Sequence, residues 1–339
     1  MLSVVELDTR ESSRAAAAPT PDAANDRAAT SMATSLAEQV KPFPVEISAA
    51  QEPLYDYTMR PYPAAVDPAG RLRSTMLLYQ LLEGSRQKQA WMRLIAGLRE
   101  KLGVHRTVWG IKRVDGRFGA ELYFYFRTLS SASPRDGGAE TIPEPITFAQ
   151  VADALAPTLK IRPTYPAHAP AIMVSVDVND EILARGEIEQ LQVYLRSGLS
   201  WEVRADRIEH ANHYTFFELA EMDRLRALIE HQANGLLHAS ACGVDIAQLL
   251  LPRLYNCRTL CLAAKRQTEG IYFAGIDTDQ LRWFMQHFDW PQSTQAFLAA
   301  RADGFLHVRW DVGLDFVATA AGAGGANLRW VKGGVYGTL

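Results

Sequence analysis

Three lysines lie in segments that read as β-strands, and small residues stand beside each of them. The lysines and their small neighbours are Lys112 with Gly110, Lys265 with Cys261 and Ala263, and Lys332 with Gly333 and Gly334. Because side chains two positions apart share one face of a strand, small neighbours leave space beside an ammonium group. An ammonium with such space can bind an anion. The alternative is structural, because a lysine on an edge strand keeps sheets from pairing edge to edge.

A second pattern is the alternation of polar and apolar residues with period two. The segment Phe305–Phe316 is the clearest case and predicts a strand with one polar face. That face would consist of His307, Arg309, Asp311 and Asp315. Earlier polar sets with the same spacing are Glu121, Tyr123 and Tyr125; Ser175 and Asp177; Gln190, Gln192, Tyr194 and Arg196; and Glu202, Arg204 and Asp206. A sheet face open to water would look similar. The tyrosines and the mixture of charges favour the lining of a pocket.

The elements that would position these residues are strands in consecutive hairpins with helices between them. The expected strands are residues 107–114, 120–128, 171–178, 190–196, 201–206, 213–218, 259–266, 271–275, 305–319 and 328–336. Two helices are expected within residues 71–102, with a break at Gly84-Ser85. A third begins at the cap Thr147 and ends at Pro157, and a fourth begins at the cap Asp277 and ends at Phe288. Two more are expected at residues 219–232 and 245–254. This order predicts an α/β (α+β) fold, in which about ten antiparallel strands carry helices on one outer face. Ten strands are near the limit at which an open twisted sheet must curl or close into a barrel.

Composition places the chain among ordinary globular proteins. Its 339 residues are 48% hydrophobic and 22% charged, and the net charge of -3 argues against a nucleic-acid partner. No apolar run approaches the roughly 20 residues that span a bilayer, so we expect no membrane partner and a cytoplasmic location. Residues 1–50, rich in Ala, Ser, Thr and Pro, are predicted to form a disordered leader, and residues 51–339 a single domain. The aromatic, proline-stiffened segment Tyr55–Pro63 is expected to lie as an arm on the folded body.

Common catalytic and metal-binding motifs are missing from the sequence. The chain has no Gly-x-Ser-x-Gly elbow, no His-Glu-x-x-His motif and no pair of aspartate-rich segments that would hold magnesium. Cys257 and Cys261 would stand about 13 Å apart on one strand face, too far to share an ion, and are interpreted as buried apolar residues. We therefore expect no metal site and no cofactor, with magnesium left open.

Two segments resemble a known family. Lys265–Gln267 followed by Ile271–Phe273 and a helix, together with Lys332–Tyr336, is similar to the repeat unit and closing strand of the aromatic prenyltransferases of the ABBA, or PT-barrel, class. The resemblance implies ten antiparallel strands closed into a barrel with helices outside and a polar lumen. It also implies transfer of an isoprenoid group from its diphosphate to an aromatic acceptor. One departure is the stretch 171–218, where two hairpins follow each other with no helix between them.

The resemblance also implies roles for particular residues. Lys265 and Lys332 would bind the diphosphate, and Tyr272 and Tyr336 would belong to a tyrosine shield around the carbocation. Arg309 joins the diphosphate ligands only because it shares the polar strand face.

Two functional hypotheses follow. The first is a prenyltransferase-like enzyme with small-molecule substrates, in which Glu121 or Asp311 takes the proton from the acceptor. Its substrate-binding residues would be Lys112, Lys265, Arg309, Lys332, Tyr123, Tyr272 and Tyr336. The second is a non-catalytic binding or scaffold protein, whose open polar sheet face and aromatic arm hold a protein or peptide. Pairing between the strand of Lys112 and the strand of Lys332 would close the sheet and exclude the second hypothesis.

Overall fold

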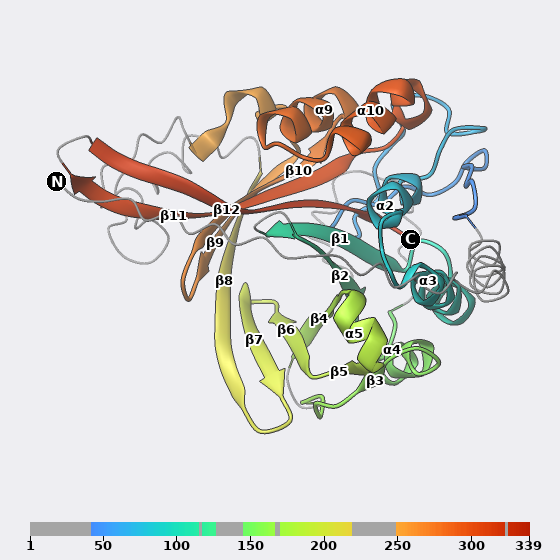
Figure 1. Cartoon of the computed structure of the whole chain (residues 1–339), viewed down its shortest axis with the longest axis vertical. Helices are drawn as coiled ribbons and strands as arrows, with labels where there is room; N and C mark the ends of the chain where they lie inside the picture. Colours follow the sequence, from blue (N-terminus) through green and yellow to red (C-terminus); the bar gives the residue numbers. More distant parts are fainter. Residues whose placement is uncertain (1–41, 115–116, 127–144, 167–169, 219–248, 323–324) are drawn as a thin grey trace, which may run out of the picture. The chain divides into compact units, whose positions relative to one another are not determined.

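Ten antiparallel strands of this protein close into a barrel (Figure 1). The structure is a computed structural model that describes residues 42–114, 117–126, 145–166, 170–218, 249–322 and 325–339. The barrel strands are β1 (Thr107–Val114), β2 (Arg117–Tyr125), β4 (Ala171–Val178), β6 (Gln190–Leu195), β7 (Leu199–Arg204), β8 (Ile208–Glu218), β9 (Thr259–Lys265), β10 (Glu269–Ile276), β11 (Trp310–Gly322) and β12 (Gly325–Thr338). Their order around the barrel is β1-β12-β11-β10-β9-β8-β7-β6-β4-β2. The predicted antiparallel α/β fold is therefore confirmed in its closed form.

Closure depends on the pairing of β1 with β12, which joins residues more than 200 positions apart in the chain. Lys112 lies opposite Gly334, and Val114 lies opposite Lys332. On the other side of β1, β2 pairs with β1 and also with β4. A barrel of this kind has no free edge strand. The hypothesis of an open sheet that holds a partner on its exposed face is therefore wrong.

The stretch 171–218 does contain a helix, which the sequence analysis missed. This is the short helix α5 (Asp180–Arg185), which lies between β4 and β6. Asn179 caps it through a hydrogen bond from the Ile182 amide, and Gly186 ends it in the left-handed conformation, with φ of 71°. A helix of six residues is too short to show a 3.6-residue periodicity, so only its caps mark it in the sequence. The two short strands β3 (Lys160–Ile161) and β5 (Glu187–Ile188) pair in parallel outside the barrel.

The remaining helices cover the outer face of the barrel, as predicted. They are α2 (Thr75–Leu82), α3 (Lys88–Leu102), α4 (Phe148–Leu155), α9 (Thr278–His287) and α10 (Gln292–Ala300), with 3₁₀ turns η2 (Pro252–Leu254) and η3 (Ala302–Phe305). Capping boxes with Gln150 and Gln280 confirm Thr147 and Asp277 as N-caps. Helix α10 was not predicted. The helix expected at residues 219–232 lies outside the described residues. Of the one expected at 245–254, residues 249–254 are described, and Pro252–Leu254 form η2.

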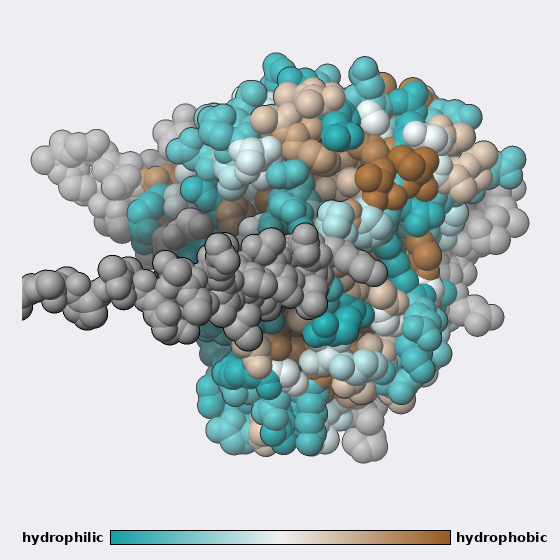
Figure 2. Space-filling view, turned by 45° about the vertical axis from the view of Figure 1, so that its right-hand side comes forward, coloured by the Kyte–Doolittle hydropathy of each residue, from teal (hydrophilic) through white to brown (hydrophobic). Residues whose placement is uncertain are grey.

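The main hydrophobic core lies between these helices and the outward side chains of the strands. From the helices it takes residues such as Trp91, Leu98 and Phe284, and from the strands Trp109 and Phe124. The outward strand residues alternate with the polar residues predicted for the other face, so the polar face points into the barrel. Hydrophilic residues cover most of the surface shown in Figure 2, with hydrophobic residues gathered in a few places. None of the helices in the described part of the chain is long and apolar enough to cross a membrane.

The predicted strand 305–319 begins later than expected. Residues Ala302–Phe305 form η3, the Val308 amide donates to the Phe305 carbonyl, and β11 begins only at Trp310. Phe305 and Val308 are both buried, a spacing of three that suits a 3₁₀ turn and not a strand, in which residues three apart lie on opposite faces. His307 and Arg309 are therefore not on the polar strand face, and the Nε2 atom of His307 instead lies 3.1 Å from the hydroxyl of Ser48.

The folded unit also begins earlier than residue 51. Glu46 and Ser48 are buried, and Glu46 accepts hydrogen bonds from Thr75 and Tyr79 of α2 and from Arg99 of α3. The last residues of the predicted leader are thus part of the fold.

Candidate functional site

The barrel encloses a cavity of about 930 Å³. Every strand of the barrel contributes to its lining, and residues 57, 58 and 60 contribute as well. Eight of the nine predicted site residues line it: Lys112, Glu121, Tyr123, Lys265, Tyr272, Asp311, Lys332 and Tyr336. Arg309 does not, because it precedes β11, and its amide instead donates to the hydroxyl of Tyr62. The period-two pattern thus placed eight of these nine residues on the lumen face, and the misplaced strand start accounts for the exception, Arg309.

Five tyrosines form a continuous belt around the lumen, which we call the tyrosine belt. In order around the barrel they are Tyr123, Tyr194, Tyr214, Tyr272 and Tyr336. The centroid of each ring lies 5.8 to 6.5 Å from that of the next, and Tyr336 closes the belt at 6.0 Å from Tyr123. Burial raises the pKa of all five hydroxyl groups, so the belt is uncharged at neutral pH. Tyr214 lies in the predicted strand 213–218, for which no polar face was proposed, and β8 itself begins earlier, at Ile208.

Glycines on neighbouring strands make room for two of these rings. A Cβ atom at Gly313 would overlap the ring of Tyr272, and a Cβ atom at Gly110 would lie 2.5 Å from the ring of Tyr336. The tyrosines can therefore lie flat against the strands and leave the middle of the lumen open. This corrects the expectation that Gly110 leaves space for an anion beside Lys112. Gly333 does not border the lumen at all, since its Cβ position faces the ring of Trp290.

Three lysines lie next to the tyrosine belt together with three carboxylates, and we call these six residues the lysine layer. They are Lys112, Lys265, Lys332, Glu121, Asp177 and Asp315. The ammonium of Lys265 lies 2.7 Å from both oxygens of Asp315 and 2.6 Å from the Tyr272 hydroxyl. The ammonium of Lys112 pairs with Glu121, and with Asp177 at 2.9 Å. Lys112 is thus a residue of the lumen, and the alternative of an edge-strand lysine is wrong.

Lys332 is held less tightly than the other two lysines. Among the described residues its ion pair is the contact of 3.7 Å with Asp315. Burial and the charges of Lys112 and Lys265 lower its pKa from 10.5 to about 8. For Lys112, burial acts in the same direction, but the charges of Asp177 and Glu121 outweigh it and raise the pKa. Lys332 can therefore gain or lose a proton near pH 8.

The two predicted proton acceptors differ in their surroundings. Glu121 accepts hydrogen bonds from Tyr123 at 2.6 Å, from Ser175 and from Tyr194 at 3.3 Å. Burial acts to raise the pKa of Glu121, but Lys112 and Lys332 outweigh it and lower the pKa to about 2. Glu121 is thus ionised and joins the tyrosine belt to the lysine layer.

Asp311 lies at the other end of the lumen and has backbone partners. Each of its oxygens accepts one amide proton at 2.7 Å, from Tyr57 and from Gly275. Burial and the nearby charge of Asp56 raise its pKa to about 8. Because both oxygens of Asp311 accept main-chain hydrogen bonds, Asp311 anchors the segment around Tyr57.

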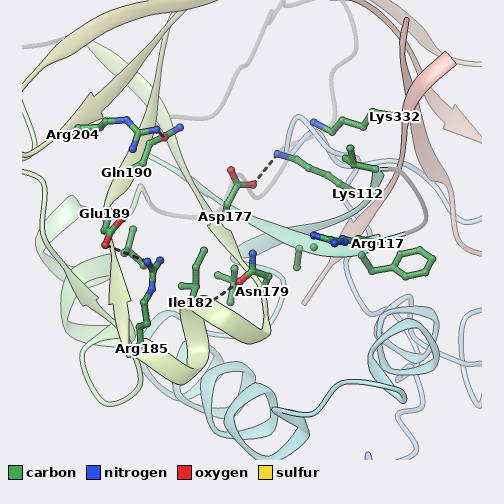
Figure 3. Close-up of a pocket in the computed structure, with 16 residues that line it drawn as sticks. Lys112, Arg117, Asp177, Asn179, Ile182, Arg185, Glu189, Gln190, Arg204 and Lys332 are labelled. Atoms are coloured by element: carbon green, nitrogen blue, oxygen red, sulfur yellow. Dashed lines mark hydrogen bonds and ion pairs between the residues drawn. The ribbon is translucent and has the colours of Figure 1, made fainter. Parts of the chain in front are cut away.

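A second cavity, of about 500 Å³, adjoins the lumen at the lysine layer. Lys112, Asp177 and Lys332 line both cavities. Figure 3 shows Lys112 reaching toward Asp177 with Lys332 beside it, while Arg204 lies against Gln190. These three shared residues therefore lie between the lumen and the outer cavity.

Comparison with known proteins adds a likeness of fold. No protein-family model matches this chain, and none of the curated proteins does. Among solved structures, the chain is similar to the crystal structure of NotF prenyltransferase, with 10% sequence identity and a TM-score of 0.43. The similarity covers 77% of this chain and 92% of that chain. The closed barrel itself rests on the strand pairing, which confirms the fold implied by the resemblance to the ABBA, or PT-barrel, class.

Proposed function

We propose that this protein is a transferase that moves a prenyl group from an isoprenoid diphosphate to an aromatic small-molecule acceptor inside the barrel. The observation that carries the proposal is the position of the lysine layer directly beside the tyrosine belt. The two are joined by the contact between Lys265 and the Tyr272 hydroxyl and by the hydrogen bond from Tyr123 to Glu121. Prenyl transfer needs cationic groups around the diphosphate and aromatic rings around the neighbouring carbocation, so the two sets of residues must be adjacent.

The chemistry uses each layer in turn. The bond between the allylic carbon and the diphosphate oxygen breaks, and its electron pair leaves with the diphosphate. Ammonium groups of Lys112, Lys265 and Lys332 stabilise the negative charge that develops there. The faces of the tyrosine rings stabilise the allylic cation, which water would otherwise capture. The aromatic acceptor then supplies an electron pair for the new bond, and the pyrophosphate leaves.

The acceptor must finally lose a proton. Glu121 takes it in this proposal, because Glu121 is an ionised carboxylate that borders the tyrosine belt. A low pKa does not prevent this step, since the cation formed by attack on an aromatic ring is a strong acid. Asp311 is assigned to a different task, because both of its oxygens already accept main-chain protons.

Ligand binding tests the proposal before any acceptor is known. Thermal shift is measured with pyrophosphate, dimethylallyl diphosphate and geranyl diphosphate, and we expect stabilisation by the prenyl diphosphates of a few kcal/mol at saturation. Lys265→Met should abolish this stabilisation, whereas Lys160→Met, at an exposed lysine outside the barrel, should leave it unchanged. The absence of any shift with all three ligands would contradict the proposal.

A further inference from the structure

The segment 54–62, which we call the closing loop, folds on itself before it meets the barrel. The Tyr62 amide donates to the Leu54 carbonyl at 3.0 Å, and the Asp56 amide donates to the Arg60 carbonyl at 3.0 Å. Within the loop, Oδ1 of Asp56 accepts hydrogen bonds from the amide and hydroxyl of Thr58 and from the amide of Arg60. These internal bonds give the loop a defined shape without help from a ligand.

The closing loop is fastened to strands on several sides of the barrel. Arg60 binds Glu218 of β8 at 3.0 Å and Thr259 of β9 at 2.8 Å. The Tyr57 amide donates to Asp311 of β11, and the Tyr57 carbonyl accepts the hydroxyl of Tyr125 of β2. Since β2 and β8 lie far apart in the strand order, the loop crosses the end of the barrel. The aromatic segment, which was expected to lie as an arm on the folded body, therefore closes one end of the lumen.

The register of β11 gives the depth of the lumen. Asp315 lies opposite Lys332 and belongs to the lysine layer, whereas Asp311 lies opposite Tyr336 and binds the closing loop. Asp315 lies four positions after Asp311, which corresponds to about 13 Å along the strand. The lysine layer and the closing loop thus lie at opposite ends of the lumen, with the tyrosine belt between them.

Tyr57 carries its side chain from the closing loop into the lumen. Its ring meets Tyr123 at 5.0 Å and Tyr336 at 5.2 Å between centroids, in both cases nearly perpendicular. The ring lines the cavity, and among the described residues no hydrogen-bond partner is found for its hydroxyl group. Tyr57 is thus the side chain that a ligand extending from the lysine layer through the tyrosine belt would meet last.

We infer that Tyr57 determines the length of the prenyl chain that the lumen accepts. The inference rests on the proposed function, because it takes the diphosphate of the ligand to lie in the lysine layer. With the diphosphate held there, the chain runs along the lumen and its far end packs against the ring of Tyr57. An apolar pocket discriminates by the space at its far end, so a smaller residue at position 57 admits a longer chain.

Binding of unreactive thiolodiphosphate analogues with geranyl and farnesyl chains tests this inference. The quantity measured by calorimetry is the ratio of the two dissociation constants, farnesyl over geranyl. We expect Tyr57→Ala to lower this ratio on the order of tenfold or more and Tyr57→Leu to lower it by less. Tyr57→Phe keeps the ring and should keep the ratio of the unchanged protein.

The variant Arg60→Ala distinguishes the effect of a loosened loop from the effect of a smaller side chain at position 57. It removes the hydrogen bonds to Glu218 and Thr259 but keeps Tyr57. We expect this variant to retain the original ratio. An unchanged ratio in Tyr57→Ala, or an equal shift in Arg60→Ala, would overturn the role of the Tyr57 ring. If the unchanged protein binds neither analogue nor pyrophosphate, the proposed function fails together with the inference. If it binds them and the ratio does not respond to Tyr57→Ala, the inference fails alone.

Discussion

The ammonium of Lys265 lies 2.7 Å from both carboxylate oxygens of Asp315, so this lysine is neutralised before any ligand arrives. The same carboxylate is the ion-pair partner of Lys332, at 3.7 Å. Asp315 therefore serves two lysines, and its charge sets how strongly this part of the lumen attracts an anion.

Replacement of Asp315 by Asn should weaken the fold and strengthen anion binding. The change leaves Lys265 without its counter-charge, and we expect a loss of about 1–3 kcal/mol in the free energy of unfolding. Pyrophosphate should then stabilise the variant more than it stabilises the unchanged protein, because the lysine layer carries one more net positive charge. Urea unfolding with and without pyrophosphate measures both effects. Asp153→Asn is the control, since the Asp153 side chain lies in α4 outside the barrel, is 68% exposed, and its loss should change stability by about 0.5 kcal/mol or less and leave pyrophosphate binding unchanged.

Binding of pyrophosphate should weaken as the pH rises from 7 to 9. Lys332 has a pKa of about 8, so it loses its charge in this range while the anion needs the charge. The stability of the folded protein without pyrophosphate should change in the opposite direction, rising with pH. Between about pH 8 and 10.5 the unfolded chain holds a proton on Lys332 that the folded protein lacks, so stability rises with pH there.

The variant Lys332→Met isolates this behaviour. It should remove the pH dependence of pyrophosphate binding between pH 7 and 9 and leave the melting temperature unchanged or slightly raised, because a crowded positive charge is lost. A large fall in melting temperature with intact pyrophosphate binding would show that Lys332 supports the fold and not the ligand.

A methyl group at Gly313 should disturb the tyrosine belt. Its Cβ would overlap the ring of Tyr272, so Gly313→Ala must displace that ring and its contact with Lys265. We expect a cost of about 1–3 kcal/mol in unfolding free energy, together with weaker binding of prenyl diphosphates. The matched control is Gly333→Ala, whose Cβ would stand 3.6 Å from the ring of Trp290, an ordinary contact. Equal melting temperatures for the two variants would contradict this account of Gly313.

Removal of the Asp311 carboxylate should free the closing loop. Asp311→Ala leaves the amides of Tyr57 and Gly275 without acceptors, which should cost about 1–3 kcal/mol. Hydrogen exchange at the Tyr57 amide should become faster, whereas Asp153→Ala, at an exposed residue of α4, should leave it unchanged. Unaltered exchange at Tyr57 would exclude Asp311 as the anchor.

The pH response of Asp311 has a definite sign. Its pKa is raised from 3.8 to about 8, so the folded protein holds a proton that the unfolded chain releases above about pH 4. The stabilisation from this proton is complete below pH 4 and is lost as the pH rises through 8. Comparison of the unchanged protein with Asp311→Asn by urea unfolding across this range checks the sign.

The sequence by itself determined the strand face on which most of the predicted lumen residues lie. The strand 171–178 and the caps Thr147 and Asp277 were predicted as they stand in the structure, because alternation and capping depend on neighbours in the chain. The inward positions of Glu121, Lys265 and Lys332 follow from the same local geometry. A strand places every second side chain on one face whatever it pairs with.

Only the tertiary structure decided what those residues meet. Closure depends on pairing between β1 and β12, and no local pattern records a contact between positions so far apart. The entry of Tyr57 into the lumen and the exclusion of Arg309 also depend on long-range contacts, with Asp311 and with Tyr62. The pairing of Lys265 with Asp315 likewise depends on the register of three strands. Local dihedral preferences set the face on which a side chain lies, whereas the packing of distant segments sets its neighbours, and the proposed chemistry depends on those neighbours.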